Sequence, residues 1–230
     1  MLKTTDLNGV KKIALSFLNI DIKETPVSPI VVDHPIFESG IIALKSEVIN
    51  ILTFDGLKKV KESYTEKIKN SKDLFSVYII IRRAYRLTFL KYIKPYLSIE
   101  DFSKLLADAW VSSENPNQDV NCSLSLLTRW FKESDKQILM NEEDYEVYCN
   151  LPDQFQIYRG VAVGRNPKGL SWTPNYEKAV WFSKRFDRED KKGYVQAATV
   201  KKEKVLAYFN TRGEDEIVVN TRDLIGIEII

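Results

Sequence analysis

Three short polar segments in the last third of the chain carry side chains whose types and spacing could do chemistry. They are Tyr158-Arg159-Gly160, Ser171-Trp172-Thr173 and Glu214-Asp215-Glu216, and each lies beside or inside an apolar run that is typical of a β-strand. The planar arginine side chain can hold a phosphate through two parallel hydrogen bonds. A carboxylate can stabilise positive charge that develops on a sugar when a glycosidic bond breaks.

The acidic segment is unusual for its position. Three adjacent acids precede the apolar run Ile217-Val218-Val219, although like charges repel and the burial of a carboxylate is unfavourable. Glu214 and Glu216 are two residues apart, so a strand would place both on one face. Each segment also has an ordinary interpretation: an acidic turn, an arginine in a salt bridge at a strand end, and a serine in a strand that ends before Pro174.

The order and spacing of the three segments resembles the Arg / Ser-x-Thr / Glu-x-Glu pattern of mono-ADP-ribosyltransferases. The surrounding sequence is similar to a group of phage- and prophage-encoded proteins with this C-terminal fold, and the similarity covers roughly residues 105–225. The segments that carry it are Leu151-Pro152 to Arg159-Gly160, Gly169-Leu-Ser-Trp-Thr, Ala179-Val-Trp-Phe, Ala109-Trp110 and Glu114-Asn-Pro-Asn. One departure is Pro174, which stands where the family's Ser-Thr-Ser pattern ends in serine.

The resemblance implies a role for each site residue. Glu216 would bind the ribose hydroxyl and stabilise the ribosyl cation, Ser171 would orient that glutamate, and Glu214 would engage the nucleophile. Arg159 would anchor the phosphate and ribose of NAD, with Gly160 against the nicotinamide amide. The full set that the resemblance assigns to NAD binding is Arg159, Gly160, Ser171, Thr173, Phe182 and Arg185.

The resemblance also implies which acceptor the protein would use. A glutamate at the position of Glu214 is usual where the acceptor is an arginine, which favours a protein target over a nucleic acid. The segment Tyr208 to Gly213 matches the target-recognition loop in position, so Tyr208 or Phe209 is expected to touch the acceptor.

The implied function is an NAD-dependent mono-ADP-ribosyltransferase acting on a macromolecule inside a bacterial or phage-infected cell. It would serve as a toxin, a defence effector or a phage takeover factor, and an antitoxin or inhibitor protein would then be a partner. Two alternatives stay open: an RNA or DNA acceptor, and a binding module without catalysis. An RNA 2′-phosphotransferase is disfavoured, because that family relies on a histidine where this chain has none after His34.

Composition is that of an ordinary globular protein. The 230 residues are 44% hydrophobic and 29% charged, with a formal net charge of +2. The longest uncharged apolar run, Leu74 to Ile81, is far below the roughly 20 residues that a membrane span needs. The first twelve residues are too polar for a signal peptide. We therefore expect a cytoplasmic protein with no membrane partner.

Few residues could bind a metal. His34 is the only histidine, which excludes zinc sites built on two or more histidines, so NAD is expected as co-substrate and no metal is expected. Because His34 precedes Pro35, we expect it in a surface turn. Cys122 and Cys149 are the only cysteines, and both are expected to be reduced, buried thiols.

Basic residues gather in one stretch of the C-terminal third. This stretch has two interpretations: a solvated hairpin, or a basic rim that contacts NAD phosphates or a polyanionic target. Its members are Lys184, Arg185, Arg188, Lys191 and Lys192, followed by Lys201, Lys202 and Lys204.

The element pattern predicts an α+β protein. A helical N-terminal region, 1–100, is expected to pack on an ADP-ribosyltransferase-like domain, 101–230, which has a helical lead-in (101–150) and a β sandwich (151–230) with an inserted helix. Apolar periodicity predicts helices within 1–18, 41–69 with a break at Asp55-Gly56, 73–92, 98–110, 123–134, 141–148 and 175–186. Val-, Ile-, Tyr- and Thr-rich runs predict strands at 156–163, 169–173, 193–201, 204–209, 216–220 and 224–230.

Overall fold

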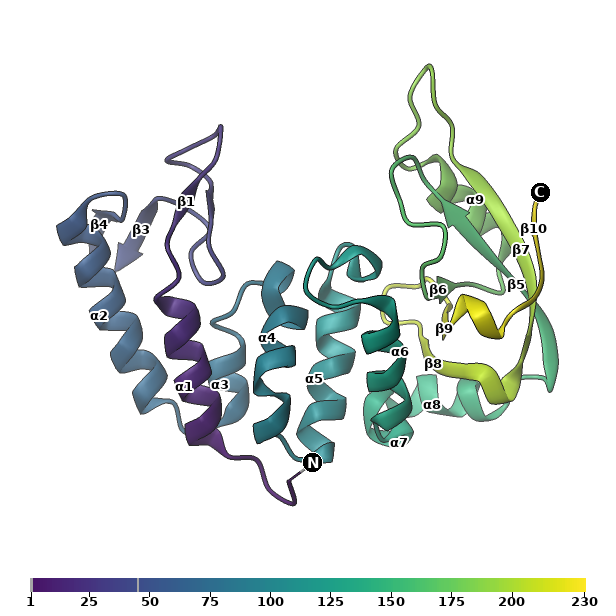
Figure 1. Ribbon diagram of the computed structural model, residues 1–230, viewed down its shortest axis with the longest axis horizontal. Helices are drawn as coiled ribbons and strands as arrows, with labels where there is room; N and C mark the ends of the chain where they lie inside the picture. Colours follow the sequence, from purple (N-terminus) through teal and green to yellow (C-terminus); the bar gives the residue numbers. More distant parts are fainter. Residues whose placement is uncertain (1, 45) are drawn as a thin grey trace. The chain divides into compact units, whose positions relative to one another are not determined.

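A computed structural model describes residues 2–44 and 46–230, and the chain divides into two compact units, 1–98 and 99–230. Helices and small antiparallel sheets occur together, so the mixed α+β class expected from the sequence is confirmed (Figure 1). No helix in the described ranges is long and apolar enough to cross a membrane.

The N-terminal unit is mainly helical with two short strand pairs (Figure 1). Its largest buried side chains include Tyr78, Phe37 and Phe89, which build a core separate from the candidate site. The elements are α1 (Leu7–Leu18), β1 (Lys23–Glu24), β2 (Val32–Asp33), β3 (Ile41–Leu44), β4 (Glu47–Asn50), α2 (Phe54–Asn70), α3 (Leu74–Tyr78), η1 (Arg83–Tyr85), α4 (Arg86–Ile93) and η2 (Lys94–Tyr96).

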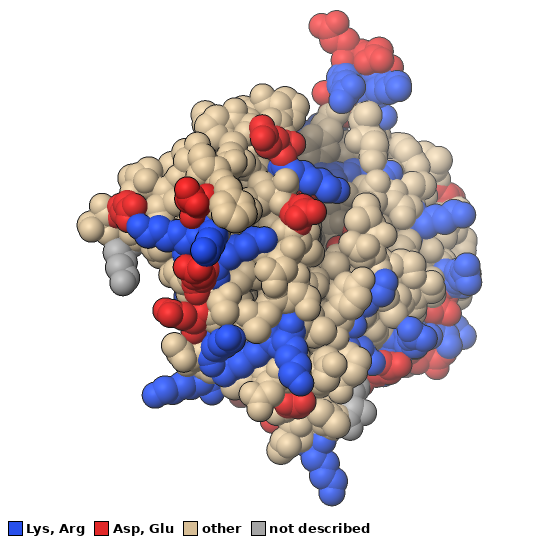
Figure 2. All heavy atoms as spheres, turned by 60° about the vertical axis from the view of Figure 1, so that its left-hand side comes forward, with Lys and Arg blue, Asp and Glu red and all other residues tan. Residues whose placement is uncertain are grey.

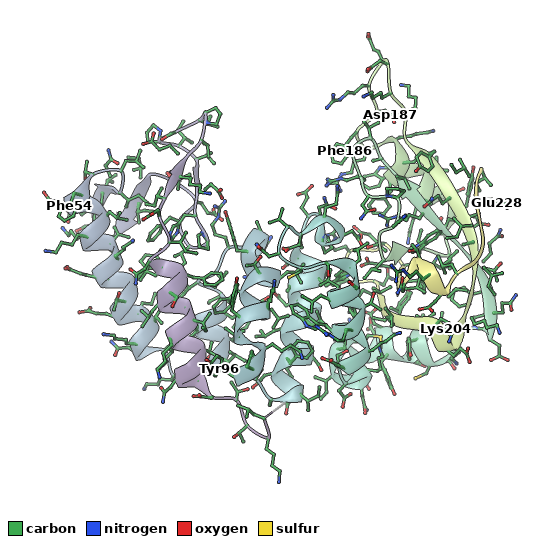
Figure 3. The ribbon with its side chains drawn as sticks, viewed as in Figure 1. Phe54, Tyr96, Phe186, Asp187, Lys204 and Glu228 are labelled. Carbon is green, nitrogen blue, oxygen red and sulfur yellow. The ribbon has the colours of Figure 1, made fainter. Side chains whose placement is uncertain are left out.

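The expected helix over 41–69 is wrong in its first part. Residues 41–44 and 47–50 form the antiparallel pair β3–β4, and Asp55-Gly56 lies in the first turn of α2 instead of interrupting a helix. Thr53 sets this start, because its hydroxyl accepts a hydrogen bond from Gly56 N at 3.2 Å. Phe54 then points outward and is 82% exposed (Figure 3).

The single helix expected over 73–92 is also wrong. It is divided into α3, a turn, η1 and α4, and Arg82 shows why. The guanidinium of Arg82 donates hydrogen bonds to the carbonyl oxygens of Val32, His34 and Phe37, at 3.1 to 3.2 Å. These contacts hold the chain in an extended conformation at Arg82, with ψ of 144°.

His34 is buried instead of lying on a surface turn, with an exposed fraction of 1%. Its Nδ1 accepts hydrogen bonds from the backbone N–H groups of Ile36 and Phe37, each at 3.1 Å, and its Nε2 lies 3.1 Å from Ile20 O. Burial lowers the pKa of His34 to about 4, so the neutral ring is the native form.

The C-terminal unit begins with a helical part and continues into two three-stranded antiparallel sheets (Figure 1). The sheet orders are β10-β7-β5 and β6-β9-β8. The elements are α5 (Ile99–Ser112), η3 (Pro116–Gln118), α6 (Leu124–Glu133), α7 (Lys136–Leu139), α8 (Glu142–Cys149), β5 (Gln154–Val161), β6 (Ser171–Trp172), α9 (Tyr176–Lys184), β7 (Tyr194–Lys201), η4 (Lys202–Lys204), β8 (Val205–Phe209), β9 (Glu216–Val219), η5 (Thr221–Asp223) and β10 (Ile225–Ile229).

The strands expected in this unit and the helix after Pro174 are present, within a few residues of their predicted ends. Asn175 begins α9, since its side chain accepts a hydrogen bond from Lys178 N at 3.1 Å. The two sheets are joined by a short bridge, in which Tyr158 N donates to Thr173 O at 2.7 Å and Thr173 N to Tyr158 O at 2.8 Å. This bridge fixes the first two polar segments against each other.

The two cysteines differ in their surroundings. Both thiols are free, and Cys122 is buried as expected, whereas Cys149 is exposed. Cys149 is the last residue of α8, next to the exposed C-cap Asn150, and the end of this short helix faces solvent.

Candidate active site

A cleft of about 140 Å³ in the C-terminal unit brings the three polar segments together. Arg159 enters it from β5, Ser171 from β6, and Glu216 from the first position of β9. β6 pairs with β9, Ser171 opposite Val218, so the serine and the glutamate belong to adjacent strands of one sheet. Each member of the expected constellation therefore lines the same cleft.

Arg159 is the most deeply placed member, with an exposed fraction of 8%. Its Nη1 donates to Ser171 O at 2.5 Å and its Nη2 to Asn166 O at 2.9 Å. Burial lowers the pKa of Arg159 to about 10, and the negative charge of Glu216 opposes that shift. Arg159 therefore has a structural role that the sequence did not show: it ties β5 to the backbone before and within β6.

Two glycines allow this arrangement. A Cβ at Gly169 would lie 2.1 Å from Arg159 Nη2, so the guanidinium occupies the space that a side chain there would take. A Cβ at Gly160 would lie 2.1 Å from Ala179 O, so the missing side chain lets α9 approach β5 closely. Gly160 also lines the cleft, but the space beside its Cα is taken by the helix.

Glu216 sits between hydrogen-bond donors on two sides. The indole Nε1 of Trp110, on α5, donates to Glu216 Oε1 at 3.1 Å. Burial raises the pKa of the Glu216 carboxyl, while hydrogen bonds from Ser171 and Trp110 partly offset that rise. The site thus holds a half-buried carboxylate with Trp110 and Ser171 as its hydrogen-bonding neighbours.

Ser171 is itself held in place by Asn117. Asn117 Nδ2 donates to Ser171 Oγ at 2.9 Å, and Asn117 Oδ1 accepts from Leu170 N at 2.6 Å. A second asparagine, Asn166, reaches Asn117 O with its Nδ2 at 3.4 Å. The segment 115–117 thereby aligns the serine with the glutamate.

Glu214 lines the cleft but does not lie on the strand, which corrects the expectation of a shared strand face. β9 begins at Glu216, and Asp215 adopts a left-handed conformation with φ of 49°. The Asp215 side chain turns away, forming an ion pair with Lys178 and accepting a hydrogen bond from Tyr208 OH at 2.8 Å. Glu214 reaches the cleft from a loop instead.

Tyr208 and Phe209 are placed differently from the expected target-recognition residues. Both are buried residues of β8, with exposed fractions of 5% and 4%, and the Tyr208 hydroxyl donates a hydrogen bond to Asp215. Phe209 lines the cleft wall. The loop that follows them is 210–215; in it Arg212 is exposed, Glu214 is half-buried, and both line the cleft.

The remaining expected NAD-binding residues also line the cleft, and the structure gives two of them additional partners. Thr173 Oγ1 accepts from Asn175 N at 3.2 Å, at the start of α9. Arg185 Nη2 lies 3.2 Å from Glu114 Oε1, and its guanidinium lies 5.5 Å from the Phe186 ring centre. Phe182 is half-buried in the wall.

The basic stretch is exposed and mixed in sign. Between Arg185 and Lys192 the chain also carries Asp187, Glu189 and Asp190, and Lys192 lies 3.9 Å from Asp187. Figure 3 marks Phe186 and Asp187, where the chain leaves α9 for this loop. On the face seen in Figure 2, lysine and arginine side chains are likewise interspersed with acids. Such a surface gives a weak field for a polyanion.

Trp110 and Asn117 line the cleft but were not assigned to the site from the sequence, and Asn166 acts from outside the lining by accepting a hydrogen bond from Arg159. The segments Ala109-Trp110 and Glu114-Asn-Pro-Asn were noticeable in the sequence only through the expected resemblance to ADP-ribosyltransferases. Among the described residues, no group of three or more His, Cys, Asp or Glu side chains could hold a metal ion.

The chain matches no model of a known protein family, and it has no significant match among curated protein sequences or solved structures.

Proposed function

We propose that this chain is an NAD-dependent mono-ADP-ribosyltransferase with an ADP-ribosyltransferase-like C-terminal unit. The observation that carries the proposal is the convergence of Arg159, Ser171 and Glu216 from three strands on one cleft. Their order along the chain, which ends with the acidic pair Glu214 and Glu216, resembles the Arg / Ser-x-Thr / Glu-x-Glu pattern of mono-ADP-ribosyltransferases.

The chemistry of the site is consistent with cleavage of the nicotinamide–ribose bond. Glu216 presents a half-buried carboxylate whose pKa is raised by burial, so its field on a developing ribosyl cation is less screened than that of a surface carboxylate. Arg159 donates one N–H from each Nη to a backbone carbonyl oxygen, and its side chain lines the cleft. The second N–H of each Nη is left as a donor for a bound anion.

The aromatic and apolar wall of the cleft offers a binding surface for the nicotinamide end of NAD. Phe182, Phe209 and Trp172 line the cleft beside the polar residues. A pocket that combines an apolar wall with a few fixed polar groups is the usual form of a small-molecule site. In this proposal the wall receives nicotinamide and the arginine side receives the pyrophosphate.

The proposed acceptor is an arginine side chain of a protein, and the role of the enzyme is that of a toxin, defence or phage effector. Glu214 at the cleft supports this, because a carboxylate there can position a guanidinium and take its proton. The mixed charge of the loop after α9 gives less support to an RNA or DNA acceptor.

The test of catalysis compares the unmodified protein with Glu216→Gln. This change keeps the size of the side chain but removes its charge, so nicotinamide release should fall on the order of 10²-fold or more. NAD affinity, measured by calorimetry, should change far less. Glu203→Gln, an exposed glutamate in η4, is the matched control. Near-normal turnover in Glu216→Gln would show that the catalytic glutamate is assigned wrongly.

A second experiment separates cleavage from transfer. Labelled NAD and a cell lysate are incubated with the protein, and the labelled product is treated separately with protease and nuclease. Glu214→Gln should suppress labelling of the macromolecule while slow hydrolysis of NAD continues, because water needs less positioning than a guanidinium. If nuclease releases the label and protease does not, the acceptor is a nucleic acid and not a protein.

A further inference from the structure

Arg212 occupies the place beside Glu214 that an acceptor guanidinium would take. Its Nε and Nη2 both donate to Glu214 Oε1, at 2.9 and 2.7 Å, and its Nη1 donates to Val111 O at 2.9 Å. Arg212 and Glu214 line the same cleft as Glu216 and Ser171. A guanidinium of the chain itself is therefore already bound to the acidic group proposed to receive acceptors.

The loop holds Arg212 at the cleft instead of leaving it to swing freely. Asn210 N donates to Asp144 Oδ1 at 3.1 Å, and Asp215 N donates to Asn210 Oδ1 at 3.0 Å, so both ends of the loop are fastened. The side chain of Arg212 is nevertheless 42% exposed. A group that is both positioned and accessible suits an attacking nucleophile.

The other arginines at the cleft have different partners. Arg185 pairs with Glu114 at 3.2 Å, and the guanidinium of Arg165 lies 4.8 Å from the ring centre of Phe186. Arg159 is buried and holds backbone carbonyls. Arg185 is also partly exposed and contacts a carboxylate, but among the cleft arginines it is Arg212 that contacts Glu214, whose negative charge also acts on Glu216.

We propose that Arg212 is an intramolecular acceptor of ADP-ribose, modified by the cleft in which it lies. This inference rests on the proposed function. The bond between the anomeric carbon of the ribose and the nicotinamide nitrogen breaks, and nicotinamide leaves with the electron pair. A nitrogen of the Arg212 guanidinium forms the new bond to that carbon, and its proton passes to Glu214 and then to water. NAD and arginine thus give ADP-ribosylarginine, nicotinamide and one proton.

The modification has a consequence for the same site. An ADP-ribose attached to Arg212 stays tethered at the cleft, where it occupies space that NAD and a second acceptor would need. The modified protein should therefore bind NAD less well and transfer less to other acceptors, so the reaction limits itself as it proceeds.

The experiment uses the full chain with NAD and no added acceptor, followed by peptide mapping by mass spectrometry. One ADP-ribose is expected on the peptide that contains Arg212. The adduct should disappear in Arg212→Lys, which keeps the positive charge, and persist in Arg222→Lys, an exposed arginine of η5. The rate of modification should not depend on protein concentration, and Glu216→Gln protein mixed with unmodified enzyme should stay unlabelled.

The outcomes separate this inference from the function on which it rests. If the protein releases nicotinamide and modifies a free guanidino compound such as agmatine, but Arg212 stays unmodified, the inference is overturned and the proposed function stands. A rate that rises with protein concentration would overturn the intramolecular step. If neither nicotinamide release nor any transfer occurs, the proposed function fails and this inference fails with it.

Discussion

Trp110 Nε1 donates a hydrogen bond to Glu216 Oε1 at 3.1 Å, and the two residues are 106 positions apart in the chain. The bond links α5, in the helical part of the C-terminal unit, to the first residue of β9. Hydrogen bonding to the charged form of a carboxyl favours ionisation, so Trp110 works against the burial that raises the pKa of Glu216.

Trp110→Phe removes this donor and also shortens a buried aromatic side chain, so its effect is compared with that of the same change at a second buried tryptophan. We expect kcat for NAD cleavage to fall about tenfold at neutral pH, the loss typical of one hydrogen bond to a charged group. Because the pKa of Glu216 should rise further, the acid limb of the pH–rate profile should move to higher pH. Trp130→Phe, at another buried tryptophan of this unit, is the control. An unchanged acid limb would mean that Trp110 only fills space.

Arg159→Lys tests whether the buried arginine binds NAD or only ties strands together. Lysine keeps a charge but lacks the planar fork, so KM for NAD should rise on the order of tenfold. Loss of the hydrogen bonds to Ser171 O and Asn166 O should also reduce stability by about 1–2 kcal/mol, measured by thermal unfolding. Arg129→Lys, on the exposed face of α6, controls for the substitution itself. Reduced stability with unchanged NAD affinity would assign Arg159 a structural role alone.

Asn117→Asp examines the alignment of Ser171. The aspartate keeps the oxygen that accepts from Leu170 N but loses the N–H that donates to Ser171 Oγ. We expect kcat to fall about tenfold with a smaller change in KM, since one orienting hydrogen bond is lost. Asn115→Asp makes the same change two residues earlier, where the amide contacts Gln118 instead. Equal effects of the two variants would point to the added negative charge as the cause.

His34 should make the N-terminal unit sensitive to acid. Its pKa is lowered from 6.5 to about 4, so the stabilisation from the neutral ring is complete above pH 6.5 and is lost as the pH falls towards 4. The difference between the two pKa values corresponds to about 3 kcal/mol of stability.

The measurement is hydrogen exchange at the amides of Ile36 and Phe37, which donate to the ring. Their protection should fall between pH 7 and pH 4.5. His34→Asn offers an acceptor oxygen near the position of Nδ1 but cannot titrate, so this variant should lose less protection over that range. Parallel loss in both proteins would indicate that other groups cause the acid sensitivity.

The strands of the C-terminal unit could be predicted because their signal is local. Runs such as Lys204–Phe209 and Glu216–Asn220 are rich in β-branched and aromatic residues, and they fold as β8 and β9. The N-terminal unit was harder. In β3 and β4 most side chains are exposed, so the mixture of apolar and charged residues over 41–50 imitates the spacing of a helix.

The break within 73–92 has a tertiary cause that periodicity cannot reveal. The contacts of Arg82 with Val32, His34 and Phe37 join residues 45 to 50 positions apart. The same holds for the burial of His34: a histidine before a proline is typical of a turn, and only the surrounding fold shows that the turn is enclosed.

For the site, the sequence indicated residue types but not their supports. Arg159, Ser171 and Glu216 stand out in the sequence because each is a polar residue beside or inside an apolar, strand-like run. Trp110 acts through a hydrogen bond over 106 positions, and Asn117 acts through two hydrogen bonds over 53 and 54 positions. Nothing in their own neighbourhoods distinguishes them from core or loop residues. The resemblance to known proteins included their segments but assigned them no role.

Because the backbone of Asp215 is left-handed, Glu214 and Glu216 belong to different elements and can be changed independently. Glu216 belongs to the sheet, where it pairs with Phe209, whereas Glu214 belongs to a surface loop that begins at Asn210. Surface loops tolerate exchange far better than paired strands do. Under the proposed function, exchange of Thr211 to Glu214, with Asn210 kept because it fastens the loop, should change the acceptor preference while Glu216 keeps its place in the sheet.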